Sequence, residues 1–146
     1  MGTAEDVVAR FNAMINARDL AGLAALMTPD HTFVDSTGAT VAGRRRCVEA
    51  WRGFFAAFPS YRNEFSSIRA ADAFVLVTGR SRCTELAELD GPALWTAVTD
   101  GDLVREWRVH EDTPANRRAL GVAEDPAGPD QAAGARPGPT SRPANR

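Results

Sequence analysis

The stretch VVARFNAMINARDLAGLAALMTPDHTFVD, residues 7–35, decides how this chain folds. Apolar side chains recur in its first part at steps of three and four residues, which predicts an amphipathic helix. A second short helix is expected between Asp19, a suitable N-cap, and Pro29, which ends it. Residues 31–37 (HTFVDST) then alternate as a strand does. The two helical stripes consist of Val7, Val8, Phe11, Met14 and Ile15, and of Leu20, Leu23, Leu26 and Met27.

Beyond this stretch, the pattern predicts one more long helix and then four strands. Gly43 precedes the helix, which has a broad aromatic face, and Pro59 ends it. Asp-Gly pairs at residues 90–91 and 100–101 predict turns between strands. A final helical turn is expected over residues 113–121, with Thr-Pro at its start and glycine at its end. The four strands are expected at residues 61–69, 74–86, 93–99 and 103–111.

This order of elements predicts an α+β domain, in which helices of the N-terminal half cover one face of a curved antiparallel sheet. We expect the domain to occupy residues 1–121. Residues 124–146, EDPAGPDQAAGARPGPTSRPANR, contain no aromatic residue and no Val, Leu, Ile or Met. Such a segment cannot bury enough surface to offset its ordering entropy. Residues 122–146 are therefore predicted to form a disordered tail.

Composition excludes several classes of protein and partner. Hydrophobic residues make up 44% and charged residues 25% of the chain, as in ordinary globular proteins. No apolar run approaches the roughly 18–20 residues that cross a bilayer. The first ten residues lack the apolar core of a secretory signal, so a cytoplasmic location is expected. Because the formal net charge is only −2, we expect neither nucleic acid nor a membrane as a partner.

Motifs for metals and cofactors are not found in the sequence. Cys47 and Cys83 form no CxxC pair, and His31 and His110 have no ligand spacing. Two reduced, half-buried thiols and no bound metal are therefore expected. No GxGxxG, Walker or GxSxG pattern is present, so any chemistry is expected to need no cofactor. All 17 basic residues are arginine, which excludes a Schiff base on lysine.

Three stretches together resemble the nuclear-transport-factor-two-like superfamily, and within it the SnoaL-like polyketide cyclases and ketosteroid isomerases. They are residues 7–35, residues 41–59 (VAGRRRCVEAWRGFFAAFP) and residues 100–121 (DGDLVREWRVHEDTPANRRALG). The first is similar to the family's two-helix entry into a strand that ends in a catalytic aspartate. The resemblance spans residues 5–121. It implies a cone-shaped, cystatin-like α+β barrel with three helices packed on the concave face of its sheet.

Asp35 is the leading candidate for a catalytic residue. On an alternating strand it shares a face with Phe33, and the resemblance matches it to the general base of the ketosteroid isomerases. A carboxylate in an apolar cone has its pKa raised toward neutrality, which suits removal of a proton beside a carbonyl. In the alternative interpretation, Asp35 faces solvent at the end of the strand and caps the turn at Gly38.

The oxyanion donors of the ketosteroid isomerases have no counterpart in this chain. The resemblance places Phe11 where that family has a tyrosine, and a phenyl ring cannot donate a hydrogen bond to an enolate. The family's second donor, a protonated aspartate, would fall near Trp95 or Thr96. Steroid isomerisation is therefore not expected.

The last predicted strand, residues 103–111, has two faces with different chemistry. In one interpretation, Trp107 faces the core and the charged face meets water. The resemblance implies the opposite, with the charged face in the cone and Trp107 on an outer surface used for a dimer. One face carries Val104, Glu106, Arg108 and His110, and the other carries Leu103, Arg105, Trp107 and Val109.

With the charged face in the cone, His110 or Asp112 would be the partner acid or base, since histidine titrates near neutrality. Arg108 would stabilise an enolate or hold a substrate carboxylate. Glu106 would pair with Arg108, because an unpaired buried charge is costly. A further set of aromatic side chains is expected to line a pocket for a flat, mostly apolar ligand. This set of expected substrate-binding residues contains Phe11, Phe33, Trp51, Phe55 and Trp95.

Other charged residues have less specific interpretations. Arg80 and Arg82 share a strand face that is expected to be solvated, and His31 is expected at the surface. Three consecutive arginines, residues 44–46, open the third helix, where cations oppose the helix dipole. An anion site, a dimer contact and a solvated basic patch all remain open for them.

We therefore expect a cofactor-free cyclase or isomerase that moves a proton beside a carbonyl of a polyketide- or steroid-like substrate. Asp35 would be the base, with His110 or Asp112 as the partner acid. One alternative is a non-catalytic module that binds a hydrophobic ligand or dimerises. Another is an epoxide hydrolase built from Asp35, Arg108 and Asp112. A homodimer through the open face of the sheet is also expected.

Overall fold

A computed structural model of the protein describes residues 2–122. The predicted tail, residues 122–146, lies outside the described residues apart from Val122. The elements are α1 (Ala4–Ala17), α2 (Leu20–Ala25), β1 (Met27–Val34), β2 (Thr40–Ala42), α3 (Arg44–Ala57), β3 (Arg62–Ala71), β4 (Phe74–Arg82), the short 3-10 helix η1 (Ala87–Leu89), β5 (Gly91–Asp100), β6 (Leu103–Glu111) and α4 (Pro114–Leu120).

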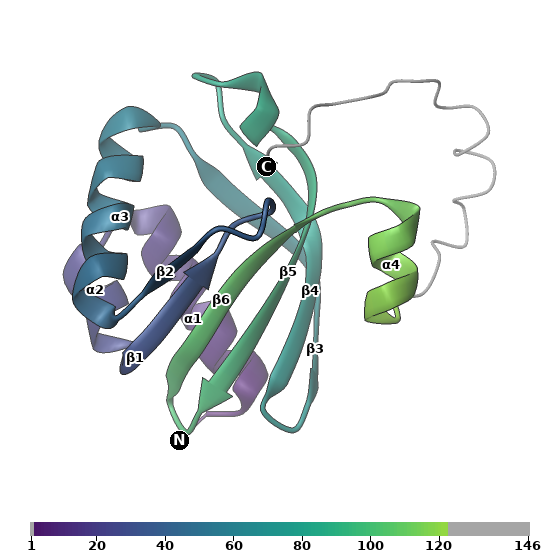
Figure 1. Cartoon of the computed structure of the whole chain (residues 1–146), viewed down its shortest axis with the longest axis horizontal. Helices are drawn as coiled ribbons and strands as arrows, with labels where there is room; N and C mark the ends of the chain where they lie inside the picture. The colour runs from purple at the N-terminus through teal and green to yellow at the C-terminus, as the bar shows by residue number, and fades with distance from the viewer. Residues whose placement is uncertain (1, 123–146) are drawn as a thin grey trace.

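The six strands form one curved sheet in the order β2-β1-β6-β5-β4-β3 (Figure 1). Strands β3 to β6 pair antiparallel in chain order, as the predicted meander requires. Strand β1 runs parallel to β6, with Phe33 beside Trp107, so the sheet is mixed and not fully antiparallel. Helix α3 and helix α4 lie on opposite sides of the sheet in Figure 1. The predicted α+β class, with a curved sheet and packed helices, is confirmed.

Local sequence explains where the helices begin and end. Thr3 caps α1 through a reciprocal pair of hydrogen bonds with the third residue of the helix. Asp19 caps α2, and Thr113 caps α4, each by accepting a hydrogen bond from a backbone N–H of the first turn. Gly121 ends α4 at a φ of 76°, a conformation that glycine adopts without strain. The caps predicted at Asp19 and over residues 113–121 are therefore confirmed.

The region around Pro29 differs from the prediction. Helix α2 ends at Ala25, and β1 begins at Met27, so the strand starts earlier than expected and contains the proline. Proline cannot donate to a strand ladder. The pairing of β1 with β6 is interrupted between Met27 and Thr32, and this irregularity accommodates Pro29.

Other elements also differ from the prediction. The short strand β2, which pairs with β1, was not predicted. Strand β4 ends at Arg82, before the predicted residue 86. Strand β5 begins at Gly91, inside the predicted turn, because η1 makes part of the connection from β4.

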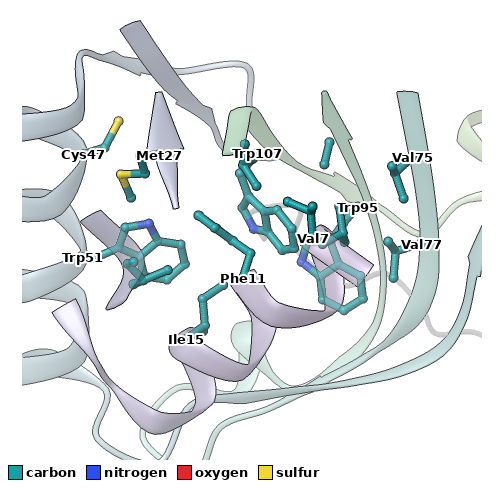
Figure 2. Close-up of a cluster of buried hydrophobic side chains, with 14 of the residues drawn as sticks. Val7, Phe11, Ile15, Met27, Cys47, Trp51, Val75, Val77, Trp95 and Trp107 are labelled. Atoms are coloured by element: carbon teal, nitrogen blue, oxygen red, sulfur yellow. The ribbon is translucent and has the colours of Figure 1, made fainter. Parts of the chain in front are cut away.

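The main core lies between α1 and the concave face of the sheet (Figure 2). Phe11 contacts both His31 and Trp107, at ring-centroid distances of 5.7 and 4.8 Å. Cys47 and Cys83 are free thiols, but both are buried, whereas half-buried positions were expected. Among residues 2–122, no helix is long and apolar enough to cross a membrane.

His31 is fully buried, so its predicted surface position is wrong. Its side chain points into the core because it shares the inward face of β1 with Phe33. The Nδ1–H group donates a hydrogen bond of 2.7 Å to the carbonyl oxygen of Val104, since a carbonyl can only accept. Nε2 is buried without a partner among the described residues. Burial therefore lowers the pKa of His31, and the hydrogen bond to Val104 opposes this effect only in part.

Candidate functional site

A cavity of about 370 Å³ lies between α3 and the inward face of the sheet. Strand β1 contributes Phe33 and is followed directly by Asp35, and β6 contributes Val109. The volume is within the range of about 300–1,000 Å³ that is typical of small-molecule sites. The residues that line it are Phe33, Asp35, Thr37, Val41, Ala50, Trp51, Phe54, Tyr61, Leu89 and Val109.

Four aromatic rings form a continuous part of the cavity wall. Phe33 meets Trp51 at a ring-centroid distance of 5.6 Å and an interplanar angle of 66°. Trp51 meets Phe54 at 5.7 Å and 85°. Phe54 meets Tyr61 at 4.7 Å and 88°. Each contact is edge-to-face, so each ring plane is steeply inclined to the next and the four rings do not form a parallel stack. We call these four rings the aromatic box.

A buried hydrogen-bond chain fixes the position of Tyr61. Ser81 donates to Oδ1 of Asn63 at 2.9 Å, and Asn63 donates to Oδ1 of Asn12 on α1 at 3.2 Å. The hydroxyl of Tyr61 lies 3.4 Å from Oγ of Ser81. Because Ser81 uses its own proton on Asn63, it receives a hydrogen from Tyr61. This chain links the Tyr61 wall of the cavity to α1.

Asp35 lines the cavity, and its carboxylate also organises the turn that follows β1. Its Oδ1 accepts hydrogen bonds from the backbone N–H of Thr37 at 2.8 Å, from the Thr37 hydroxyl at 2.6 Å and from the N–H of Ala39 at 3.1 Å. All three bonds go to the same oxygen, and none of them goes to Oδ2. Both earlier interpretations of Asp35 are therefore partly correct: it shares the cavity face of Phe33 and it also holds the turn at Gly38.

The expectation that the pKa of Asp35 is raised toward neutrality is wrong. Partial burial alone would raise the pKa of this carboxyl group. The hydrogen bonds from Thr37, Ala39 and the backbone near Gly38 stabilise the charged form, and together they lower the pKa below its ordinary value. Asp35 is therefore ionised at neutral pH. It forms no ion pair with any residue between 2 and 122.

The predicted aromatic site residues fall into two groups. Phe33 and Trp51 line the cavity. Phe11 and Trp95 are fully buried in the core instead, and Phe55 packs behind Trp51 at a ring-centroid distance of 5.4 Å without lining the cavity. The expectation that these three contact a ligand is therefore not supported by their positions.

The expectation that Glu106, Arg108 and His110 face the cone is wrong. Trp107 is 1% exposed and packs on Phe11, so β6 turns its other face outward. On that outer face, His110 lies 2.8 Å from the hydroxyl of Thr96. Burial and the nearby charge of Arg108 lower the pKa of His110. None of the three polar residues lines the cavity, whereas their neighbour Val109 does.

Asp112 also lies outside the cavity. Both of its carboxylate oxygens accept hydrogen bonds from Arg117 of α4, at 2.6 and 3.0 Å. With Arg108 on the outer face of the sheet, the expected arrangement of Asp35, Arg108 and Asp112 for epoxide hydrolysis does not form. The interpretation that put Trp107 in the core is the correct one.

The cavity wall also contains residues that the sequence patterns did not indicate. Phe54 lies on the predicted aromatic face of its helix and was not among the selected substrate-binding residues, and no feature singled out Thr37, Tyr61 or Leu89. A local signal for Thr37 did exist, because an aspartate two residues before a threonine and three before a glycine favours a turn held by the aspartate. Leu89 lies in η1 and reaches the cavity only through the connection from β4 to β5.

Within residues 2–122, the other cationic residues do not line the cavity. Arg80 and Arg82 pair with Asp90 and Glu64 on the outer face of the sheet, as expected for a solvated face. Residues 44–46 are exposed at the start of α3. No group of His, Cys, Asp and Glu that could hold a metal ion is found in the described part of the chain.

The sequence model of the SnoaL-like domain family matches residues 8–123, which is most of the chain. The protein belongs to the SnoaL-like domain family. No curated protein sequence matches this SnoaL-like chain.

Solved structures share the fold of this SnoaL-like domain at low sequence identity. A candidate SnoaL-like polyketide cyclase from Shewanella putrefaciens is 14% identical, with a TM-score of 0.66 and coverage of 82% of this chain and 88% of that one. A LEH-like epoxide hydrolase from M. tuberculosis is 17% identical, with a TM-score of 0.67 and coverage of 75% and 78%. A protein of ketosteroid isomerase-like fold from Catenulispora acidiphila, in complex with trimethylamine, is 17% identical, with a TM-score of 0.65 and coverage of 84% and 96%. These similarities show the fold alone.

Proposed function

We propose that this SnoaL-like domain binds a small organic molecule in its cavity and catalyses cofactor-independent proton transfer on it. The observation that carries the proposal is a single carboxylate, Asp35, in a cavity with otherwise mostly apolar and aromatic walls. The structural relatives support a small organic ligand, since their descriptions include a polyketide cyclase, an epoxide hydrolase and a complex with trimethylamine.

In the proposed reaction, Asp35 is the base. A carboxylate oxygen takes a proton from a carbon next to a carbonyl, and the electron pair of that C–H bond moves to the carbonyl oxygen to form an enolate. Return of the proton to a different carbon would isomerise the substrate, and attack of the enolate carbon on a second carbonyl would close a ring. Because Oδ1 is held by three hydrogen bonds, the carboxylate is positioned before the substrate arrives.

Exchange of the α-proton of a hydrophobic ketone for deuterium, followed by NMR, tests the base role. Asp35→Asn should lower the exchange rate at least 100-fold. Asparagine retains an acceptor oxygen for Thr37 and Ala39, so the melting temperature should change little. Undiminished exchange in this variant would remove Asp35 from the mechanism.

A second candidate function is ligand binding without turnover, and two observations favour it. The hydrogen bonds that lower the pKa of Asp35 also weaken it as a base. The expected partner acids, His110 and Asp112, lie outside the cavity. Tight binding of ketones without any α-proton exchange by the native protein would select this candidate.

We also propose that the protein forms a homodimer through the outer face of the sheet. Trp107 cannot contribute to this contact because it is buried, but Phe74 at the start of β4 is 43% exposed. Light scattering at micromolar concentration should give a mass near twice 15.7 kDa. A strictly monomeric species would contradict the proposal.

A further inference from the structure

The charge of Asp35 is not balanced within the cavity. None of the ten residues that line it is arginine or histidine, and Asp35 forms no ion pair with any described residue. Hydrogen bonds from uncharged groups keep the carboxylate ionised, so its pKa is lowered without a positive charge beside it. The site therefore presents one uncompensated negative charge to any ligand that enters.

The aromatic walls add to this negative field. The face of an aromatic ring carries partial negative charge and attracts cations, most strongly for tryptophan. Trp51 lies within the wall and contacts both Phe33 and Phe54. The angles between successive rings are 66° to 88°, so the rings turn edges and faces toward the cavity from several directions. Aromatic cages that bind compact cations with alkyl groups, such as quaternary ammonium ions, have this kind of arrangement.

These observations exclude some ligand classes on electrostatic grounds. A carboxylate or phosphate ligand would meet Asp35 and the ring faces with no arginine or histidine lining the cavity to bind it. A purely apolar ligand would leave an ionised carboxylate partly desolvated and unpaired, which costs free energy. A ligand with an apolar body and one positive charge can make apolar contacts with the walls and pair its charge with the carboxylate.

We propose that the cavity recognises an organic cation, namely a tertiary amine in its protonated form or a quaternary ammonium group on an apolar body. The aromatic box of Phe33, Trp51, Phe54 and Tyr61 surrounds the cationic head, and Asp35 supplies the counter-charge. The inference rests on the proposed function only in using the same cavity for a small organic ligand. It holds whether or not Asp35 also moves a proton.

Two probes of nearly equal shape isolate the role of charge. The (3-hydroxyphenyl)trimethylammonium ion and 3-tert-butylphenol differ chiefly in the replacement of a positive nitrogen by carbon. Calorimetric titration of the full chain at neutral pH should give at least tenfold tighter binding of the cation. Equal or weaker binding of the cation than of its neutral isostere, or no binding of either probe, would overturn the proposal.

Asp35→Asn should weaken binding of the cation at least fivefold and change binding of 3-tert-butylphenol by less than twofold. Glu49→Gln is the matched control, because it also removes one negative charge but acts at an exposed carboxylate that pairs with Arg52 on α3. It should leave both affinities within twofold. An equal loss in the two variants would show that only the overall charge matters, and would overturn the proposed site.

Phe54→Leu tests the aromatic box without altering the carboxylate. Leucine keeps the wall apolar but removes the ring that contacts Trp51 and Tyr61. Binding of the cation should weaken at least threefold more than binding of its isostere. An equal change for both probes would assign Phe54 to packing alone and would contradict the box. Loss of proton exchange in Asp35→Asn together with unchanged binding of the cation would support the base role and reject this inference.

Discussion

His31 and Asp35 lie four residues apart on the same inward side of the β1 segment, and they meet opposite surroundings. His31 is fully buried against Phe11 in the packed part of the cone. Asp35 lies at the cavity, where hydrogen bonds hold it in its charged form. Phe33 lies between them and contacts the cavity ring Trp51.

The difference shows that one strand face can pack in the core at one end and border a cavity at the other. Both pKa values are lowered, but for different reasons. For His31 burial disfavours the charged form, whereas for Asp35 hydrogen bonds favour it. The end of the strand face at His31, which is packed in the core, therefore contains a neutral side chain. The end at Asp35, which borders the cavity, contains an ion.

The largest expected effect contrasts a core residue with a cavity residue. Trp107→Ala should lower the free energy of unfolding by about 3–5 kcal/mol, because the indole is enclosed on all sides. Phe33→Ala should cost about 1–2 kcal/mol, because that ring already borders empty space. Urea unfolding measures both values. A larger loss for Phe33 than for Trp107 would contradict the division into a packed and a hollow end.

Two substitutions that enlarge an alanine test the same difference between the packed core and the cavity. Ala97→Leu adds volume inside the core and should cost about 1–3 kcal/mol of unfolding free energy. Ala50→Leu adds the same atoms at the cavity and should change stability by less than about 0.5 kcal/mol while weakening ligand binding. Melting curves and calorimetry test both. Equal destabilisation by the two substitutions would show that the cavity cannot accept added volume.

The last expected effect is a dependence of stability on pH. Because burial lowers the pKa of His31 below its ordinary value of 6.5, the folded state binds fewer protons than the unfolded chain in the pH range just below neutrality. The free energy of unfolding should therefore fall as the pH is lowered through this window, by at most about 1.4 kcal/mol per pH unit for one histidine. The lowered pKa of Asp35 acts only below about pH 4.5.

Urea unfolding at several pH values checks this dependence, with a control on the outer face. His31→Gln should flatten the slope in this pH range more than His110→Gln, because His110 is only partly buried. A slope that is unchanged in His31→Gln would show that His31 does not titrate on unfolding.

Features that depend only on residues close together in the sequence could be predicted. The stripe of α1, the cap at Asp19 and the shared face of Phe33 and Asp35 follow from periods and capping rules within one segment. The wall residue Leu89 could not be predicted, because it reaches the cavity through the irregular connection after β4.

The orientation of the last strand, β6, shows why the remaining site residues were harder to predict. Alternation alone favoured Trp107 in the core, but the resemblance to the catalytic relatives favoured His110 there. The parallel pairing with β1 determines which face of β6 points inward, because it sets Trp107 beside Phe33 on the inner face. That contact joins residues far apart in the sequence, and no local pattern contains it.

Recognition of an organic cation depends most directly on the charge state of Asp35, which the NMR titration of its side-chain carboxyl carbon measures. Hydrogen bonds from Thr37 and Ala39 predict a midpoint below that of an ordinary aspartate in the free protein. A midpoint near neutrality would contradict this recognition, because the cavity would then hold an uncharged acid and could not supply the counter-charge for an organic cation.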